Sequence, residues 1–221
     1  CSEGQPALPC MKIVAVVNQK GGAGKTTLAM NLAGGLNRRG QTLVLDLDPQ
    51  GSAVQWASQG STRFPAVVKR PMPKFDGASI RKTYSEFDYV VMDCPPSLES
   101  GATLAALRAC HLAIIPVLPS PVDLWASLRL PSELELARQI NPGLRSLMVI
   151  NQLEPASALS SAMHGALEEF GLPAAKTAIR RRAIYRTAAL DGVTVYELGR
   201  RAEAAVNEFE SLLEEVSHEL A

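Results

Sequence analysis

The sequence predicts an α/β fold with a mostly parallel, twisted sheet and helices on both of its faces. Short apolar runs rich in β-branched residues alternate along the chain with longer stretches of helical spacing. A glycine-rich turn separates the first such run from the first helix, as in phosphate-binding α/β proteins. The chain has 221 residues, of which 47% are hydrophobic, so it is long and apolar enough to bury a sizeable core.

The expected strands are short and almost wholly apolar, which is typical of a parallel sheet covered on both faces. They span residues 12–17, 41–46, 88–93, 111–117, 144–150 and 172–179, and Phe64 to Lys69 form a possible further strand. The expected helices carry apolar residues three or four positions apart. They span residues 25–39, a stretch after Pro49, residues 98–109, most of 123–140, residues 156–170 and residues 195–220.

The predicted organisation is a single domain over residues 11–221. Met11 begins the first apolar run, so we interpret residues 1–10 as an N-terminal extension, either disordered or foreign to the natural protein. This segment lacks the basic start and apolar centre of a secretory signal, and no run of eighteen apolar residues predicts a membrane span. The four cysteines include no C-x-x-C pair, which favours a reduced, cytoplasmic protein.

Charge is balanced overall but not locally. Lysine plus arginine and aspartate plus glutamate both number 22, so no global charge points to nucleic acid or membrane. Residues 176–201 carry a net +5, whereas residues 202–221 carry six glutamates and no lysine or arginine. The first segment is a candidate surface for DNA phosphates, and a solvated arginine face is the alternative. Its basic residues are Lys176, Arg180, Arg181, Arg182, Arg186, Arg200 and Arg201.

The glycine-rich turn has the composition of a phosphate-binding loop. Its candidate nucleotide-binding residues are Lys20, Gly21, Gly22, Ala23, Gly24, Lys25, Thr26 and Thr27. Glycines let the backbone wrap closely around phosphates, and the N–H groups at the following helix start point at the anion. Lys25 would reach the β- and γ-phosphates, and the Thr26 hydroxyl would ligate Mg²⁺. A glycine-rich turn with a chance G-K-T is the alternative.

Five segments in order resemble motifs of the ParA/MinD family, the deviant Walker A ATPases. They are K-G-G-A-G-K-T at 20–26, D-L-D-P-Q-G at 46–51, V-V-M-D-C-P-P at 90–96, P-V-L-P-S-P-V-D at 116–123 and V-I-N at 149–151. The match extends from residue 11 to about residue 200. It implies a P-loop NTPase fold that binds ATP and Mg²⁺.

The resemblance also implies roles for single residues. Lys20 would reach across a nucleotide-sandwich homodimer to the partner's phosphates and, with Lys25 and Asp48, make up the catalytic set. Asp48 would position the attacking water. Asp46 would lie near the metal, Asp93 would hold Mg²⁺ through water, and Asn151 would lie near the adenine. From the residues alone, either Asp46 or Asp48 could cap the helix after Pro49, and Asp93 and Asn151 could be turn residues.

The implied function is that of a small, ParF-like partition ATPase. Such a protein dimerises on ATP, binds DNA non-specifically on the nucleoid, and is released when a ParB-like or adaptor protein stimulates hydrolysis. The cargo stays open among plasmids, chromosomes, chemoreceptor arrays and carboxysomes. The alternatives are a MinD-type membrane-cycling ATPase and a small-molecule ligase of the same fold, similar to dethiobiotin synthetase.

Three further features bear on these alternatives. The terminal helix carries an apolar stripe, but its polar face is glutamate, so we expect it to dock on its own domain and not on a membrane. The stripe consists of Val206, Phe209, Leu213, Val216 and Leu220. The nitrogenase-reductase branch of the same superfamily bridges its dimer with cysteines, so Cys94 and Cys110 suggest an iron–sulfur site as an alternative. Their spacing does not match that branch, and we expect buried structural cysteines. His111 begins a strand and is interpreted as a surface or hydrogen-bonded histidine.

Overall fold

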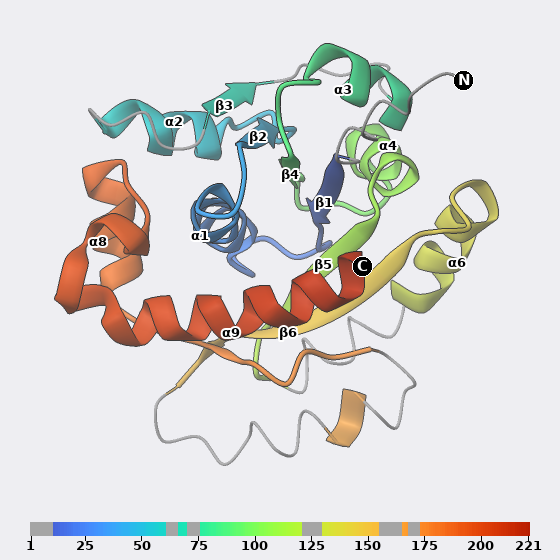
Figure 1. The fold of residues 1–221 in the computed structure, drawn as a ribbon. Coiled ribbons are helices and arrows are strands. Elements are labelled where there is room, and N and C mark those ends of the chain that lie inside the picture. Colours follow the sequence, from blue (N-terminus) through green and yellow to red (C-terminus); the bar gives the residue numbers. More distant parts are fainter. Residues whose placement is uncertain (1–10, 61–65, 70–75, 121–129, 155–164, 168–172) are drawn as a thin grey trace, which may run out of the picture.

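A seven-stranded sheet in the order β3-β2-β4-β1-β5-β6-β7 organises the molecule (Figure 1). The computed structural model describes residues 11–60, 66–69, 76–120, 130–154, 165–167 and 173–221. Its strands are β1 Lys12–Val16, β2 Thr42–Asp46, β3 Ala66–Lys69, β4 Tyr89–Asp93, β5 Leu112–Val117, β6 Arg145–Leu153 and β7 Ile179–Arg180. Every pairing between these strands is parallel, which confirms the predicted α/β class.

Helices cover both faces of this sheet. They are α1 Lys25–Asn37, α2 Ser52–Gln59, α3 Gly77–Thr83, α4 Gly101–Ala109, α6 Leu130–Ile140, α8 Ile184–Asp191 and α9 Glu203–Leu220, with 3₁₀ turns η1 Val195–Glu197 and η2 Gly199–Ala202. In Figure 1, α3, α4 and α6 lie on one face of the sheet, whereas α1, α8 and α9 lie on the other.

The core is therefore split into two layers by the sheet. Along β1, Ile13 and Ala15 join the cluster under α4 and α6, whereas Val14 and Val16 join the cluster under α1 and α9. This alternation follows from the two-residue period of a strand. All four side chains are fully buried, so β1 is apolar on both faces, as the sequence predicts for a central parallel strand.

The carboxyl ends of the central strands bring the predicted site residues together. Asp46 at the end of β2 is in register with Asp93 at the end of β4, and Asp93 is in register with Val16 of β1. The loop after β1 carries the glycine-rich turn. Ligand sites of open parallel sheets lie beyond the carboxyl ends of the strands, at the point where the strand order reverses direction.

Two predicted elements differ in the structure. The expected helix over 195–220 begins only at Glu203, because Thr194 and Glu197 form a capping box and Gly199 adopts a positive φ of 62°. The expected strand over 172–179 is wrong for most of its length. There the sheet gains one bridge at Ala174, and the Glu215 side chain of α9 accepts the N–H groups of Lys176 and Thr177.

Other predictions are confirmed, extended or fall outside the described residues. Helices α3 and α8 were not predicted, and β6 extends three residues beyond its expected end. The predicted extension 1–10, residues 123–129 of one expected helix and most of the helix expected at 156–170 lie outside the described ranges. The α9 stripe is docked on the domain as expected, since Phe209, Leu213, Val216 and Leu220 are buried.

Candidate nucleotide-binding site

The phosphate loop spans Lys20 to Gly24 and leads directly into α1. Gly22 and Gly24 have φ angles of 79° and 83°, a left-handed conformation that favours glycine. Gly24 also lies so close to β6 that a Cβ atom there would meet Asn151 Nδ2 at 2.5 Å. The two glycines are therefore required by backbone conformation and, at Gly24, by close approach.

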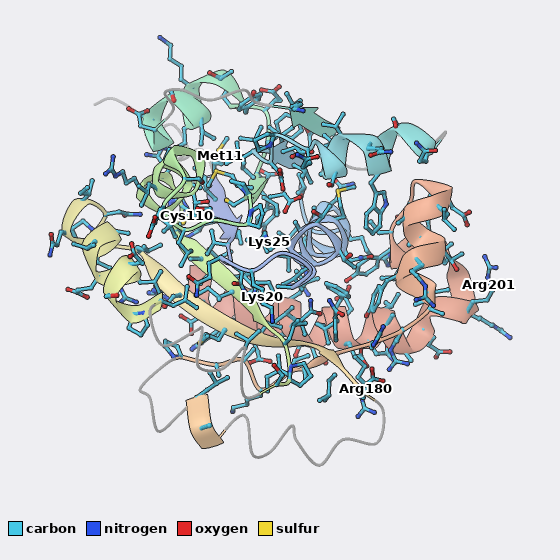
Figure 2. The ribbon with its side chains drawn as sticks, turned by 180° about the vertical axis from the view of Figure 1, so that it is seen from behind. Met11, Lys20, Lys25, Cys110, Arg180 and Arg201 are labelled. Atoms are coloured by element: carbon cyan, nitrogen blue, oxygen red, sulfur yellow. The ribbon has the colours of Figure 1, made fainter. Side chains whose placement is uncertain are left out.

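Lys25 begins α1 with its side chain largely buried beside the carboxylates. Its Nζ donates to the Lys20 carbonyl at 3.1 Å, which folds the ammonium back over the loop. Burial lowers the Lys25 pKa, and the nearby Asp93 and Asp48 charges act in the opposite direction. Figure 2 places Lys20 and Lys25 near one another at the centre of the molecule. This arrangement holds a cation over the concave side of a loop suited to phosphate.

Asp93 lies under the loop and is only 1% exposed. Its Oδ2 accepts a hydrogen bond of 2.7 Å from the Thr26 hydroxyl, whereas its buried Oδ1 has no partner among the described residues. Burial raises the Asp93 pKa to about 7. A buried carboxylate oxygen without a partner is costly. A hydrated Mg²⁺ would satisfy this oxygen, so the Thr26–Asp93 pair fits the expected metal site.

Asp46 and Asp48 hold the chain between β2 and α2. Asp46 Oδ1 accepts from the Asp48 N–H at 3.1 Å and Oδ2 from the Val54 N–H at 3.0 Å. Its pKa is raised by burial. Asp48 Oδ1 accepts from the Gln50 N–H at 2.9 Å. Both oxygens of Asp46 thus accept backbone N–H groups, and Asp46 secures the first turn of α2 through Val54, whereas the N-cap residue of α2 is Gly51 and neither aspartate.

Two amide side chains at the end of β6 contact the phosphate loop. Asn151 Nδ2 donates to the Ala23 carbonyl at 2.7 Å, and Gln152 Nε2 donates to the Gly22 carbonyl at 2.8 Å. Sequence reasoning selected Asn151 but missed Gln152. It also missed Asn18, whose buried side chain accepts from the Lys20 N–H and donates to the Pro116 carbonyl. Only their positions beside Asn151 and Lys20 could have indicated these two residues.

A pocket of about 220 Å³ adjoins the loop. It is lined by Gly24, Thr27, Leu28, Asn151, Gln152, Ile179, Arg180, Arg181, Arg182, Tyr185, Arg186 and Phe209. Tyr185 and Phe209 pack edge to face, with ring centroids 6.1 Å apart. A cavity with apolar and aromatic walls beside a phosphate loop suits a planar base. Asn151 lines this pocket, so the pocket offers a space for the adenine beside which Asn151 is expected to lie.

The basic segment proves to be divided between two environments. Arg180 and Arg182 both pair with Glu208 of α9, and Arg181 pairs with Glu154 at 3.0 Å. Arg186, Arg200 and Arg201 are exposed, and Figure 2 shows Arg201 at the end of the molecule near α8. Four of the seven predicted DNA-binding residues, Arg180, Arg181, Arg182 and Arg186, also line the pocket. The arginines are therefore not one uniform surface.

The cysteines and His111 have structural environments. Cys94 and Cys110 are free and buried, and burial raises the pKa of both thiols. Within the described ranges, no three or more histidine, cysteine or acidic side chains are grouped so that they could hold a metal ion among themselves. His111 Nδ1 accepts from the Ile13 N–H at 2.9 Å, which confirms a hydrogen-bonded histidine. None of the described helices has the length and hydropathy to cross a bilayer.

Comparisons with known proteins agree with this geometry. The model of the AAA domain matches residues 11–70. Maintenance of carboxysome distribution protein A of Halothiobacillus neapolitanus is 42% identical over 207 residues, which cover 92% of this chain and 95% of the relative. An ATP complex of a Cyanothece McdA variant has a TM-score of 0.72 at 20% identity and covers 94% of this chain and 96% of that one.

A second solved structure extends the same fold. The septum site-determining protein MinD of Pyrococcus horikoshii, in complex with Mg-ADP, has a TM-score of 0.71 at 19% identity and covers 93% of this chain and 96% of its own. The fold and the phosphate loop define a P-loop ATPase. The 42% identity over nearly the whole relative goes further: the chain belongs to the ParA/MinD family of ATPases.

Proposed function

We propose that this chain is a ParA-type positioning ATPase whose cargo is the carboxysome. The cargo assignment is supported by the relative named for carboxysome distribution, which aligns over 95% of its own length. Among the cargoes that the sequence left open, this favours the carboxysome over plasmids and chromosomes. The ATPase part depends on one structural observation, the Thr26–Asp93 pair with its unpartnered carboxylate oxygen beneath the phosphate loop.

In the proposed nucleotide site, the loop N–H groups and Lys25 bind the phosphates. Thr26 and Asp93 would hold Mg²⁺, which, when bound, neutralises charge on the phosphates. Asp48 borders the same site, since its charge acts on both Lys25 and Asp93. It would orient the attacking water and accept its proton. The pocket lined by Tyr185 and Phe209 would hold the base, with Asn151 at its inner edge.

The ATP-bound form is proposed to be a face-to-face homodimer. Lys20 is exposed at the rim of the phosphate loop while its backbone N–H is held by Asn18, so its side chain can reach outward. Its role toward the partner's phosphates follows the family resemblance. DNA binding by the exposed arginines and release by a ParB-like or adaptor protein complete the proposed cycle, which would run on the nucleoid. The MinD-type alternative loses support, because the apolar stripe of α9 is buried within its own domain.

The test is made in the native host. Deletion of the gene should leave carboxysomes clustered, and the parent sequence should restore their even spacing. A Lys20→Ala variant, which would bind nucleotide but not complete the dimer, should fail to restore it. Normal carboxysome spacing in the deletion strain would contradict the cargo assignment. Spacing restored by the Lys20→Ala variant would instead contradict the role of Lys20 in the dimer.

A further inference from the structure

Gln152 stands out by its backbone conformation. Its φ is 58°, and no other non-glycine residue within the described ranges has a positive φ. This left-handed conformation is unfavourable for a residue with a Cβ atom, and it persists only where the surroundings hold it. Gln152 lies where the pairing of β6 with β7 shifts register, between Asn151 and Leu153. The bulge turns its side chain to the phosphate loop.

The Gln152 side-chain amide makes a long-range hydrogen bond to the backbone of that loop. Its Nε2 donates to the Gly22 carbonyl, 130 positions away in sequence, at 2.8 Å. The neighbouring Asn151 donates to the next carbonyl, that of Ala23, and the Leu28 N–H donates to the Gly24 carbonyl. The end of β6 therefore holds the Gly22 and Ala23 carbonyls, and the first turn of α1 holds the Gly24 carbonyl.

A trans peptide group places its carbonyl and its N–H on opposite sides of the chain. Fixing the Gly22 carbonyl toward β6 therefore turns the Ala23 N–H to the opposite side, and fixing the Ala23 carbonyl does the same for the Gly24 N–H. Glycine at 22 and 24 leaves these peptides free to rotate, so the loop needs an external restraint to present its donors. Anion binding by a loop requires such N–H groups to converge.

We infer that Gln152 is a positioning residue for the phosphate loop. It holds the Gly22–Ala23 peptide in the orientation that directs the Ala23 N–H at a bound phosphate. This inference rests on the proposed phosphate site and adds a residue to it. The left-handed backbone of Gln152 at the register shift accompanies this hydrogen bond to Gly22. The role should act equally on bound substrate and transition state, since the phosphates remain in the loop throughout.

Two substitutions separate the amide from the strain. Gln152→Met keeps the length and the strained φ but removes the donor, whereas Gln152→Gly removes the donor and relieves the strain. We expect both variants to bind Mg-ADP about 3- to 10-fold more weakly than the parent, the effect of losing one neutral hydrogen bond. KM for ATP should rise by a similar factor with kcat changed less than about twofold.

Melting temperature should follow a different order. The Gly variant should melt at a higher temperature than the Met variant, since only the former loses the strain. Gln55→Met, at an exposed position on α2, is the matched control and should bind Mg-ADP like the parent.

Parent-like ADP affinity in the Met variant would overturn the inference. So would affinities that follow the melting temperatures, because Gln152 would then act through general stability. Failure of the parent itself to bind Mg-ADP is a different result, which would contradict the phosphate site and not the role of Gln152 within it.

Discussion

Asp93 is buried, and its Oδ1 has no hydrogen-bond partner among the described residues. Burial is the largest of the causes that raise its pKa. Nearby Asp46 and Asp48 raise its pKa further, while Thr26 and Lys25 lower it. The folded value of about 7 lies above the ordinary 3.8, so the folded chain holds an extra proton between these values. The stabilising contribution is fully present below the ordinary value and is lost as the pH rises through 7.

Asp93→Asn should remove this pH dependence. Without Mg²⁺ or nucleotide, we expect the free energy of unfolding of the variant, relative to the parent, to rise by about 2–3 kcal/mol between pH 5 and pH 8. The reason is that only the parent must ionise a buried carboxyl. Urea unfolding in EDTA at a series of pH values measures this difference. A difference that stays flat with pH would mean that Asp93 does not titrate in this range.

Asp48 is the residue for which binding and chemistry should separate. Asp48→Ala should still bind ATP, because the Asp48 carboxylate accepts its hydrogen bond from the Gln50 N–H while Lys25 and the loop N–H groups bind the phosphates. Its kcat should fall about 100-fold or more, the usual effect of removing a positioned general base. Single-turnover hydrolysis measures this, and chromatography with ATP should show a persistent dimer. Asp191→Ala, at the exposed end of α8, is the control. Normal turnover by the Asp48 variant would transfer the role to Asp46.

Among the elements, α9 does more than cover the sheet. Its Glu208 side chain accepts from the Arg180 N–H at 3.2 Å, from Arg182 Nε at 3.3 Å and from the Tyr185 hydroxyl at 3.5 Å. These partners lie on β7, the following loop and α8, and all three line the base pocket. A residue in the acidic tail of the sequence therefore shapes the wall of the nucleotide site.

Glu208→Ala should destabilise the chain. It leaves the part-buried Arg182 guanidinium and the buried Tyr185 hydroxyl without this partner, at a cost of about 1–2 kcal/mol after allowance for partial exposure. For a chain of this size that lowers the melting temperature by about 2–8 °C. Glu214→Ala, an exposed glutamate on the same helix, should change it by less than about 2 °C. Equal melting temperatures of the two variants would show that the contacts of Glu208 stabilise the fold no more than an exposed glutamate does.

The elements also differ in how well the sequence predicts them. The P-loop, Asp93 and Asn151 could be singled out, because each lies at or near the carboxyl end of an apolar strand within a short contiguous motif. The late start of the terminal helix also has a local cause, the Thr194–Glu197 capping box and the positive φ of Gly199. It was not predicted, because the apolar periodicity was extended back to residue 195. The contacts of Gln152 and Glu208 could not be predicted, since they join positions 130 and about 25 residues apart through the tertiary fold. A similar contact explains why most of residues 172–179 do not form the expected strand, since the N–H groups of Lys176 and Thr177 donate to the Glu215 carboxylate and not to a neighbouring strand.

At the scale of the whole molecule, the two halves of the charge asymmetry face each other. Glu208 of α9 neutralises part of the basic segment, because it pairs with both Arg180 and Arg182. The net +5 of residues 176–201 therefore overstates the charge available to DNA phosphates. Arg186, Arg200 and Arg201 are exposed, and none of them forms an ion pair with another residue in the described ranges.

This division predicts two different outcomes for two triple variants. Arg186→Ala, Arg200→Ala and Arg201→Ala together should weaken ATP-dependent DNA binding equally on unrelated sequences, because phosphate contacts carry no sequence information. Each lost contact should flatten the plot of log K against log salt by about one unit, so the slope falls by about three. Replacing Arg180, Arg181 and Arg182 by alanine should change the slope less. It should weaken nucleotide binding more than the first triple variant does, since it removes three arginines that line the base pocket and the first removes only Arg186.

Gel shifts with ATP on two unrelated duplexes across a salt series measure both effects, and Mg-ADP titration reports the pocket separately. Dimerisation is followed by chromatography, so that a lost dimer is not mistaken for lost DNA contacts. An unchanged slope in the first triple variant, with its ATP-dependent dimer intact, would place the DNA surface elsewhere. A larger loss of slope in the second variant, with Mg-ADP affinity retained, would mean that Arg180 and Arg182 leave Glu208 for phosphate. DNA would then compete with α9 for the same two guanidinium groups.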